Sequence, residues 1–265
     1  MKIYISADIE GTTGITDWEE ATKTHATYME FRERMTDEVV AACEGAIEAG
    51  AKEILINDAH DSGRNIIAAQ LPECARLIRG WSGHPFSMVQ DIDESFDALL
   101  FVGYHSKAGT DANPLAHTLL LKIAHLKING EIASEFQIHS YTAALVGVPG
   151  VFLSGDAGIC ADAQRINPGI VTVPVSRGIG RSTVSIAPRL AVKEIREGVV
   201  RALKGDRAKC RLTLPKHFTL EITYTNPVDA YRGSWYPGAK LAAPQTVRFE
   251  ADDYFEIIRA IRFMP

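Results

Sequence analysis

The chain has 265 residues, which suits one large domain or one domain with a small appendage, and 46% of them are hydrophobic. Its 28 basic and 33 acidic residues give a formal net charge of -5. The sequence has no Lys/Arg-rich run and no interleaving of basic and aromatic residues, so nucleic acid is excluded as an expected partner. No apolar run approaches the roughly 20 residues that cross a bilayer, so we expect no membrane association.

The cysteines and the first residues predict the cellular compartment. The four cysteines lie far apart and form no Cys-x-x-Cys pair, so no compact disulfide framework is indicated. Residues 2–7 already have the composition of a buried strand, which leaves no room for a signal peptide. We therefore expect a cytoplasmic protein.

Short apolar runs bounded by Gly, Asp or Asn recur in the first part of the chain, as is typical of strands buried on both faces of a parallel sheet. They occupy residues 3–7, 53–57, 98–103 and 150–154. Between the first two runs, apolar residues recur at helical spacing from Phe31 to Ile47, and Gly50 stands where a helix ends. This order predicts a βαβ unit.

The later elements are more mixed. Residues 118–129 have the pattern of a strand that ends in an Asn129-Gly130 turn, and residues 134–146 that of a helix with Ser134 as its N-cap. A longer helix is predicted over residues 187–203, strands over 218–224 and 246–251, and a final helix from Asp252. The predicted fold is α/β, a mostly parallel sheet flanked by helices with a smaller α+β C-terminal portion. Residues 1–265 form a single catalytic unit in this interpretation, with a soft boundary near residues 205–215.

Two carboxylates, Asp8 and Glu10, follow the first predicted strand and precede Gly11. Residues two apart on a strand point to the same face. Two neighbouring acids repel each other, so such a pair meets a cation, a basic side chain or water. A divalent metal and a solvated turn are both consistent with this segment taken alone.

Other ligand-type residues follow further predicted strands, at the sheet edge where α/β sites form. His60 comes just after the second strand, His105 follows the strand that ends at Gly103, and Glu135 opens the helix after the Asn129-Gly130 turn. With Asp8 and Glu10 this makes three carboxylates and two imidazoles, a set that suits zinc. Two zinc ions and a hydroxide would neutralise it, which is the composition of a two-metal hydrolase centre. A rival metal pair is Glu135 with His139, four residues later on the same helical face.

At this point the sequence resembles the zinc-dependent D-aminopeptidases of metallopeptidase family 55. The order and spacing of the motifs hold from Met1 to about Gly155, and a weaker likeness continues to the C-terminus. The motifs are Ser6-Ala-Asp-Ile-Glu-Gly11, Asn57-Asp-Ala-His60, Pro85-Phe-Ser-Met88, Gly103-Tyr-His105, His117 and Glu135.

The resemblance implies site roles for these residues. Asp8 would bridge two zinc ions, Glu10 would pair with His105, and His60 would pair with Glu135. His117 matches a family histidine that lies in the active site without binding metal and has a catalytic role. One departure is Phe136, which is bulkier than the residue expected beside the ligand glutamate and is predicted to narrow the pocket or to shift its preference.

The function implied by the resemblance is a two-zinc aminopeptidase that hydrolyses the N-terminal residue of short peptides, with a preference for D-amino acids. It also implies a ring-shaped homodecamer that only small peptides enter. Trp235, Tyr236 and Phe263 are candidates either for assembly contacts or for core packing.

Two other classes remain open. A two-metal phosphoesterase would need cations for the phosphoryl oxygens, and Arg64, Lys107 and Arg181 are the candidates. A non-catalytic metal-dependent binding protein would keep the ligands without a catalytic residue such as His117.

Overall fold

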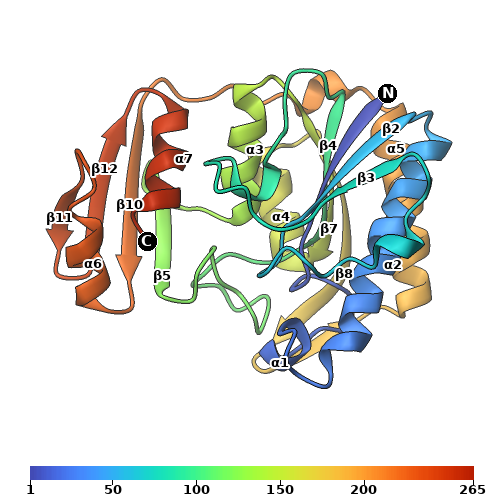
Figure 1. The fold of residues 1–265 in the computed structure, drawn as a ribbon, viewed down its shortest axis with the longest axis horizontal. Coiled ribbons are helices and arrows are strands. Elements are labelled where there is room, and N and C mark those ends of the chain that lie inside the picture. The colour runs from blue at the N-terminus through green and yellow to red at the C-terminus, as the bar shows by residue number, and fades with distance from the viewer.

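The computed structural model describes residues 1–265 and contains two separate sheets (Figure 1). Sheet A has seven strands in the order β3-β2-β1-β4-β7-β8-β9, and every neighbouring pair is parallel except the final β8–β9 hairpin. Its strands are β1 (Lys2–Ala7), β2 (Glu53–Asp58), β3 (Ala75–Ile78), β4 (Ala98–Tyr104), β7 (Gly150–Asp156), β8 (Val171–Ile179) and β9 (Ser182–Ser185). The predicted mostly parallel α/β fold is confirmed.

Helices cover both faces of sheet A (Figure 1). Leu100 and Val102 of β4 share a core with α2 (Tyr28–Glu48) and α5 (Pro188–Lys204). Leu99 and Phe101 share another core with α3 (Glu135–Leu145) and α4 (Ala157–Ile166). Successive residues of a strand point to opposite faces, so a strand covered on both sides reads as the continuous apolar run seen in the sequence.

Sheet B is antiparallel, in the order β11-β12-β10-β5-β6. Its strands are β5 (Ile123–Ile128), β6 (Glu131–Ile132), β10 (Phe218–Tyr224), β11 (Lys240–Ala243) and β12 (Thr246–Ala251). Helix α7 (Tyr254–Phe263) lies on the face of sheet B that is turned toward sheet A, and it shares a core with Ile138 of α3 (Figure 1). The smaller portion of the molecule therefore contains β5 and β6 from the middle of the chain, and a boundary near residues 205–215 stays a prediction.

Most predicted elements match, including Ser134 as N-cap of α3 and the Asn129-Gly130 turn, where both residues have positive φ. The strand predicted over residues 118–129 is wrong in its first part, because β5 begins only at Ile123. Leu119 has a φ of 64° and donates its backbone N–H to the side chain of Glu135. This N–H is therefore not available for a hydrogen bond to a neighbouring strand. Strands β3, β8 and β9 and helix α4 were not predicted. None of the helices has the length and hydrophobicity that a bilayer crossing requires.

One buried carboxylate ties α2 to the loop after Glu10. Oε1 of Glu38 accepts hydrogen bonds from the backbone N–H of Thr13 at 2.8 Å and from its hydroxyl at 2.6 Å. Oε2 of Glu38 is buried without a partner. Burial raises the pKa of Glu38 from 4.5 to about 7, despite the opposing hydrogen bonds from Thr13.

This raised pKa predicts that stability falls as pH rises from about 4.5 to about 7, because the folded protein holds a proton that the unfolded chain has released. The contribution of Glu38 over this window is at most about 3 kcal/mol. Glu38→Gln should remove it, so the free-energy difference between variant and wild type should grow with pH. Denaturant unfolding at a series of pH values, at fixed protein concentration, measures this. The exposed Glu33→Gln on the same helix is the control, and equal pH slopes for Glu38→Gln and wild type would contradict the assignment.

Candidate metal centre

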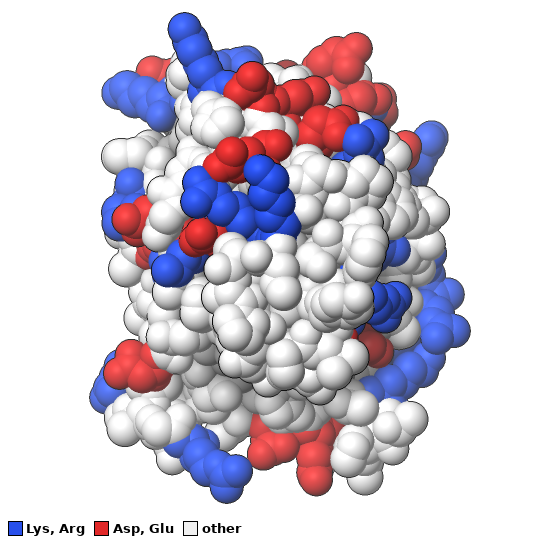
Figure 2. All heavy atoms as spheres, turned by 90° about the vertical axis from the view of Figure 1, so that its left-hand side faces the viewer, with Lys and Arg blue, Asp and Glu red and all other residues white.

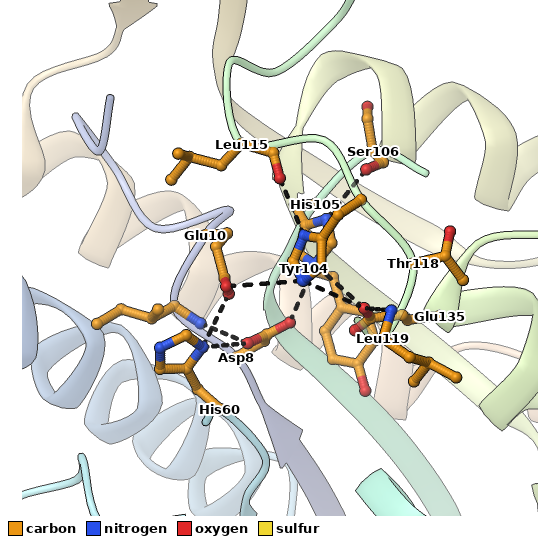
Figure 3. A network of polar contacts seen from close by, with 12 residues as sticks. Asp8, Glu10, His60, Tyr104, His105, Ser106, Leu115, Thr118, Leu119 and Glu135 are labelled. Atoms are coloured by element: carbon orange, nitrogen blue, oxygen red, sulfur yellow. Dashed lines mark hydrogen bonds and ion pairs between the residues drawn. The ribbon is translucent and has the colours of Figure 1, made fainter. Parts of the chain in front are cut away.

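The five predicted ligands meet at the carboxyl-terminal edge of sheet A (Figure 3). Strand β1 lies between β2 and β4, so the residues that follow these three strands become neighbours. Glu135 joins them as the first residue of α3. All five side chains are buried: Asp8 2%, Glu10 2%, His60 7%, His105 1% and Glu135 4% exposed.

Two glycines permit this close assembly. A Cβ atom at Gly11 would lie 1.8 Å from the carbonyl oxygen of Tyr104, and one at Gly103 would lie 2.3 Å from that of Asp8. Gly103 also has a φ of 70°, which favours glycine. The segments after β1 and β4 are joined by the hydrogen bond from Gly11 N to Gly103 O, 2.9 Å long. Any larger residue would push the two ligand-bearing segments apart.

Asp8 lies at the middle of the cluster. Its Oδ1 is 3.4 Å from Nδ1 of His60 and its Oδ2 is 3.5 Å from Nε2 of His105. Glu10 lies 3.1 Å from Nδ1 of His60, and Glu135 lies 3.5 Å from Nε2 of His105. By these contacts Glu10 lies nearest to His60 and Glu135 nearest to His105, but ligand atoms of Asp8, Glu10 and His105 also lie within 4.8 Å of one another, so the division expected from the resemblance stays a prediction. The two oxygens of Asp8 face the two pairs separately.

The backbone fixes the tautomer of each imidazole near the cluster. Nε2 of His60 lies 2.9 Å from the carbonyl of Ala21, and Nδ1 of His105 lies 3.0 Å from that of Ser106. A nitrogen beside a carbonyl oxygen carries the proton, so the other nitrogen presents a lone pair. Those lone pairs point at carboxylates, which is unfavourable unless a proton or a cation lies between them. Nε2 of His105 and Oε2 of Glu10 indeed lack a hydrogen-bond partner.

The pKa shifts of these four side chains show how strongly burial and neighbouring charges act on the cluster. Burial raises the pKa of Asp8 well above its usual range, and the charge of Glu10 adds to the rise. Burial acts likewise on Glu10, but the charge of His60 outweighs it and holds the pKa of Glu10 well below its usual range. For His60 and His105 burial lowers the pKa, yet the carboxylates prevail and raise it well above normal. Protons on the histidines compensate the buried acids here, and divalent cations supply the same compensation, so this donor set fits zinc.

His117 lies in the loop between β4 and β5, not at the start of a strand as predicted, because β5 begins later. Its Nδ1 lies 2.9 Å from the carbonyl of Leu115. Its Nε2 is 3.9 Å from Glu10 and 3.7 Å from Glu135. The ring stacks on His105 with a centroid distance of 4.3 Å and meets the edge of Trp18. The Nε2 lone pair of His117 therefore faces the cluster, close to the carboxylates of Glu10 and Glu135.

His139, the rival ligand, is engaged elsewhere. Its Nδ1 lies 2.7 Å from the carbonyl of Glu135 and its Nε2 accepts from the backbone N–H of Met88 at 3.4 Å. Burial lowers the pKa of His139 to about 4, so the ring is neutral. Both nitrogens are occupied by backbone groups, which leaves no lone pair for a metal.

A supporting network was missed in the sequence. Asp156, the N-cap of α4, accepts from the backbone N–H of Ser106 at 2.7 Å and from the side chain of Asn113 at 3.1 Å. Asn113 also donates to the carbonyl of Glu10 at 2.9 Å. This network holds the residue after His105 and the backbone of Glu10 in place. Asp156 ends β7, so its position at the carboxyl edge of a parallel strand was the available signal.

A cavity of about 560 Å³ opens onto the cluster. Much of its wall is apolar, including Trp18, Leu119, Leu121, Ile258 and Ile261. Phe136 does not line it and packs against Phe101 in the core instead, so the expectation that Phe136 narrows the pocket is wrong. The site therefore combines a buried acidic floor with an apolar chamber.

A model of the M55 peptidase family, described as D-aminopeptidase, matches residues 1–263. The chain belongs to this family. A D-aminopeptidase from Bacillus subtilis (strain 168) is 31% identical over 266 residues, covering 100% of this chain and 96% of the relative. The solved structure of the Zn-dependent D-aminopeptidase DppA from Bacillus subtilis, described as a self-compartmentalizing protease, has a TM-score of 0.94 and 30% identity, covering 100% of this chain and 96% of that one.

Family membership makes the chain an aminopeptidase, a hydrolase of peptide bonds. The two other classes are not favoured. The cations considered for a phosphoesterase, Arg64, Lys107 and Arg181, do not line the cavity. Lys107 pairs instead with Asp162 at 2.9 Å.

Proposed function

We propose that this chain is a two-zinc D-aminopeptidase that removes the first residue of short peptides. One observation carries the proposal. Backbone carbonyls hold one ring nitrogen each of His60 and His105, so the other nitrogen of each ring points into a buried group of three carboxylates. Asp8 bridges the two ions in this proposal, Glu10 and His60 complete one position, and His105 and Glu135 complete the other. The similar DppA structure is that of a Zn-dependent enzyme, which supports the choice of metal.

Zinc bound at such a centre supplies Lewis acidity toward a carbonyl oxygen and lowers the pKa of water. A zinc ion there would also hold the free amine of a peptide, which would place the first peptide bond at the cluster. The apolar wall at Leu119, Leu121 and Ile258 receives side chains and excludes water.

His117 is the catalytic side chain in this proposal. Burial lowers the pKa of His117, and the neighbouring His105 lowers it further, so the ring is neutral. Because Nδ1–H is held by the carbonyl of Leu115, the free position is the lone pair of Nε2. A neutral ring in this tautomer accepts a proton or attacks a carbonyl carbon, but it does not donate to an oxyanion. This favours a role as base or nucleophile.

Self-assembly into a ring-shaped homodecamer belongs to the same proposal. The DppA structure is described as self-compartmentalizing. The outer side of sheet B shows a broad area without charged residues (Figure 2). Helix α6 (Pro227–Gly233) and the residues after it lie on this side and expose Val228 (70%) and Trp235 (73%). Trp235 and Phe263 are exposed and therefore do not pack in the core. They are available for contacts between subunits.

A cytoplasmic location is also proposed. All four cysteines are unpaired, as a reducing compartment requires.

Zinc-loaded wild-type protein is expected to hold two ions per chain, and Asp8→Asn to lose affinity at both positions, because the oxygens of Asp8 face both histidines. Elemental mass spectrometry after dialysis measures the content. Asp206→Asn, at an exposed turn, is the control. One ion in the wild type would contradict the two-metal centre, and two ions retained by Asp8→Asn would contradict the bridge.

His117→Ala is expected to lower kcat by about a hundredfold or more while both ions stay bound, since its role is in the reaction. Steady-state kinetics and metal content are measured on the same samples. Wild-type kcat in the variant would make His117 structural. A parallel loss of metal would place it among the ligands, which its distance to Glu135 also permits.

Dipeptides that begin with D-alanine are expected to be cleaved faster than those with L-alanine, and N-acetylation is expected to abolish cleavage because the free amine is needed. Release of the first residue is measured by chromatography with zinc-loaded protein. Equal rates for the two enantiomers would remove the D-preference. Turnover of the acetylated peptide would contradict exopeptidase action.

A further inference from the structure

The charges in the wall of the cavity are unevenly distributed. Four acidic side chains line it, namely Asp8, Glu10, Asp61 and Glu135. The wall has a single Lys or Arg, Arg262, in the last turn of α7. Helix α7 approaches from sheet B, whereas the acidic cluster belongs to the edge of sheet A (Figure 1). Acid and base therefore reach the cavity from different parts of the fold.

Arg262 has no partner within the protein. It makes no ion pair and its guanidinium makes no hydrogen bond, whereas Arg248 and Arg259 nearby are both paired. Arg259, one turn earlier on α7, pairs with Glu256 and donates to the hydroxyl of Tyr236. Arg248 on the adjacent strand pairs with Glu250. The arginine that lines the cavity is thus left free, while its neighbours outside the cavity are paired.

We propose that Arg262 binds the C-terminal carboxylate of the peptide substrate, which makes the enzyme selective for short peptides with a free C-terminus. This inference rests on the proposed function. A short peptide has an amino group at one end and a carboxylate at the other, and the cavity offers the proposed metal positions for the free amine and one cation, Arg262, for the carboxylate. Guanidinium groups bind carboxylates through two parallel N–H···O bonds.

The wall beside Arg262 suits the middle of such a peptide. Ile258 and Ile261 precede Arg262 on α7, and Leu119 and Leu121 come from the loop that carries His117. These side chains contact apolar groups but offer no hydrogen-bonding atoms, so they do not fix a peptide by themselves. An extended peptide spans about 3.3–3.6 Å per residue, so binding at both ends selects length as well as charge. Longer chains or amidated ones lose the contact with Arg262.

The test compares free acids with C-terminal amides in a series of D-alanyl-oligoglycine peptides of increasing length, using zinc-loaded protein. At the preferred length we expect kcat/KM for the acid to exceed that for the amide by about fivefold, because Arg262 is exposed and an exposed charge pair gives an effect of that order. The difference should lie in KM, because the contact is remote from the cleaved bond. Arg262→Met should bring the ratio to about one, and Arg262→Lys should retain part of it.

Arg259→Met is the matched control, because it removes an arginine of the same helix that does not line the cavity, and it should keep the wild-type ratio. Equal rates for acid and amide at every length would overturn the proposal, and so would an unchanged ratio in Arg262→Met.

Calorimetry decides the question without turnover, using an analogue of each length in the series whose first peptide bond is reduced, as acid and as amide. Preferential binding of the acid that disappears in Arg262→Met supports the role of Arg262 even if no peptide is cleaved. Absence of cleavage would then overturn the proposed two-zinc D-aminopeptidase activity alone. Equal binding of acid and amide by the wild type would overturn the role of Arg262 alone.

Discussion

Three buried carboxylates that share one small volume are the constraint on which the rest of the site depends. Asp8, Glu10 and Glu135 are each at most 4% exposed, so water does not offset their repulsion. The fold brings them together through the order of β2, β1 and β4 and through Gly11 and Gly103, which allow backbone contact. Such a cluster persists only with positive charge inside it. A cation that binds this cluster therefore also stabilises the fold, because binding to the native state and folding are linked.

The cavity depends on the second sheet. Helix α7 packs against α3 through Ile138, whose carbonyl accepts a hydrogen bond from Tyr254 at 2.9 Å. The same α3 begins with Glu135. One helix thus carries a residue of the cluster at its first turn and anchors the wall of the cavity further along. Any displacement of sheet B that moves α3 would move Glu135 as well, so the size of the chamber and the geometry of the floor are coupled.

The sequence predicted the parallel sheet because strands buried on both faces, such as 98–103, leave an unmistakable apolar run. It predicted the five clustered residues because strand ends and a helix start are recognisable. Which of these residues share a metal position was given only by the resemblance, since pairing depends on rotamers and on backbone carbonyls such as that of Ala21, which come from distant segments. The sequence also missed Asp156 and the free Arg262, because neither belongs to a local pattern. The apolar periodicity wrongly predicted a strand at Leu119, because the backbone N–H of this residue is hydrogen-bonded to Glu135 and not to a neighbouring strand.

The loop that carries His117 is tied directly to the cluster. Leu119, two residues later, donates its N–H to Oε1 of Glu135 at 2.6 Å, and the hydroxyl of Thr118 donates to the carbonyl of Ala133 at 3.2 Å. Before His117, Asn113 is bonded to the carbonyl of Glu10. The imidazole is therefore held on both sides by backbone or side chains of the acids it faces. A link of this kind keeps the imidazole aligned with the carboxylate cluster, and it explains why this stretch has no sheet pairing before Ile123.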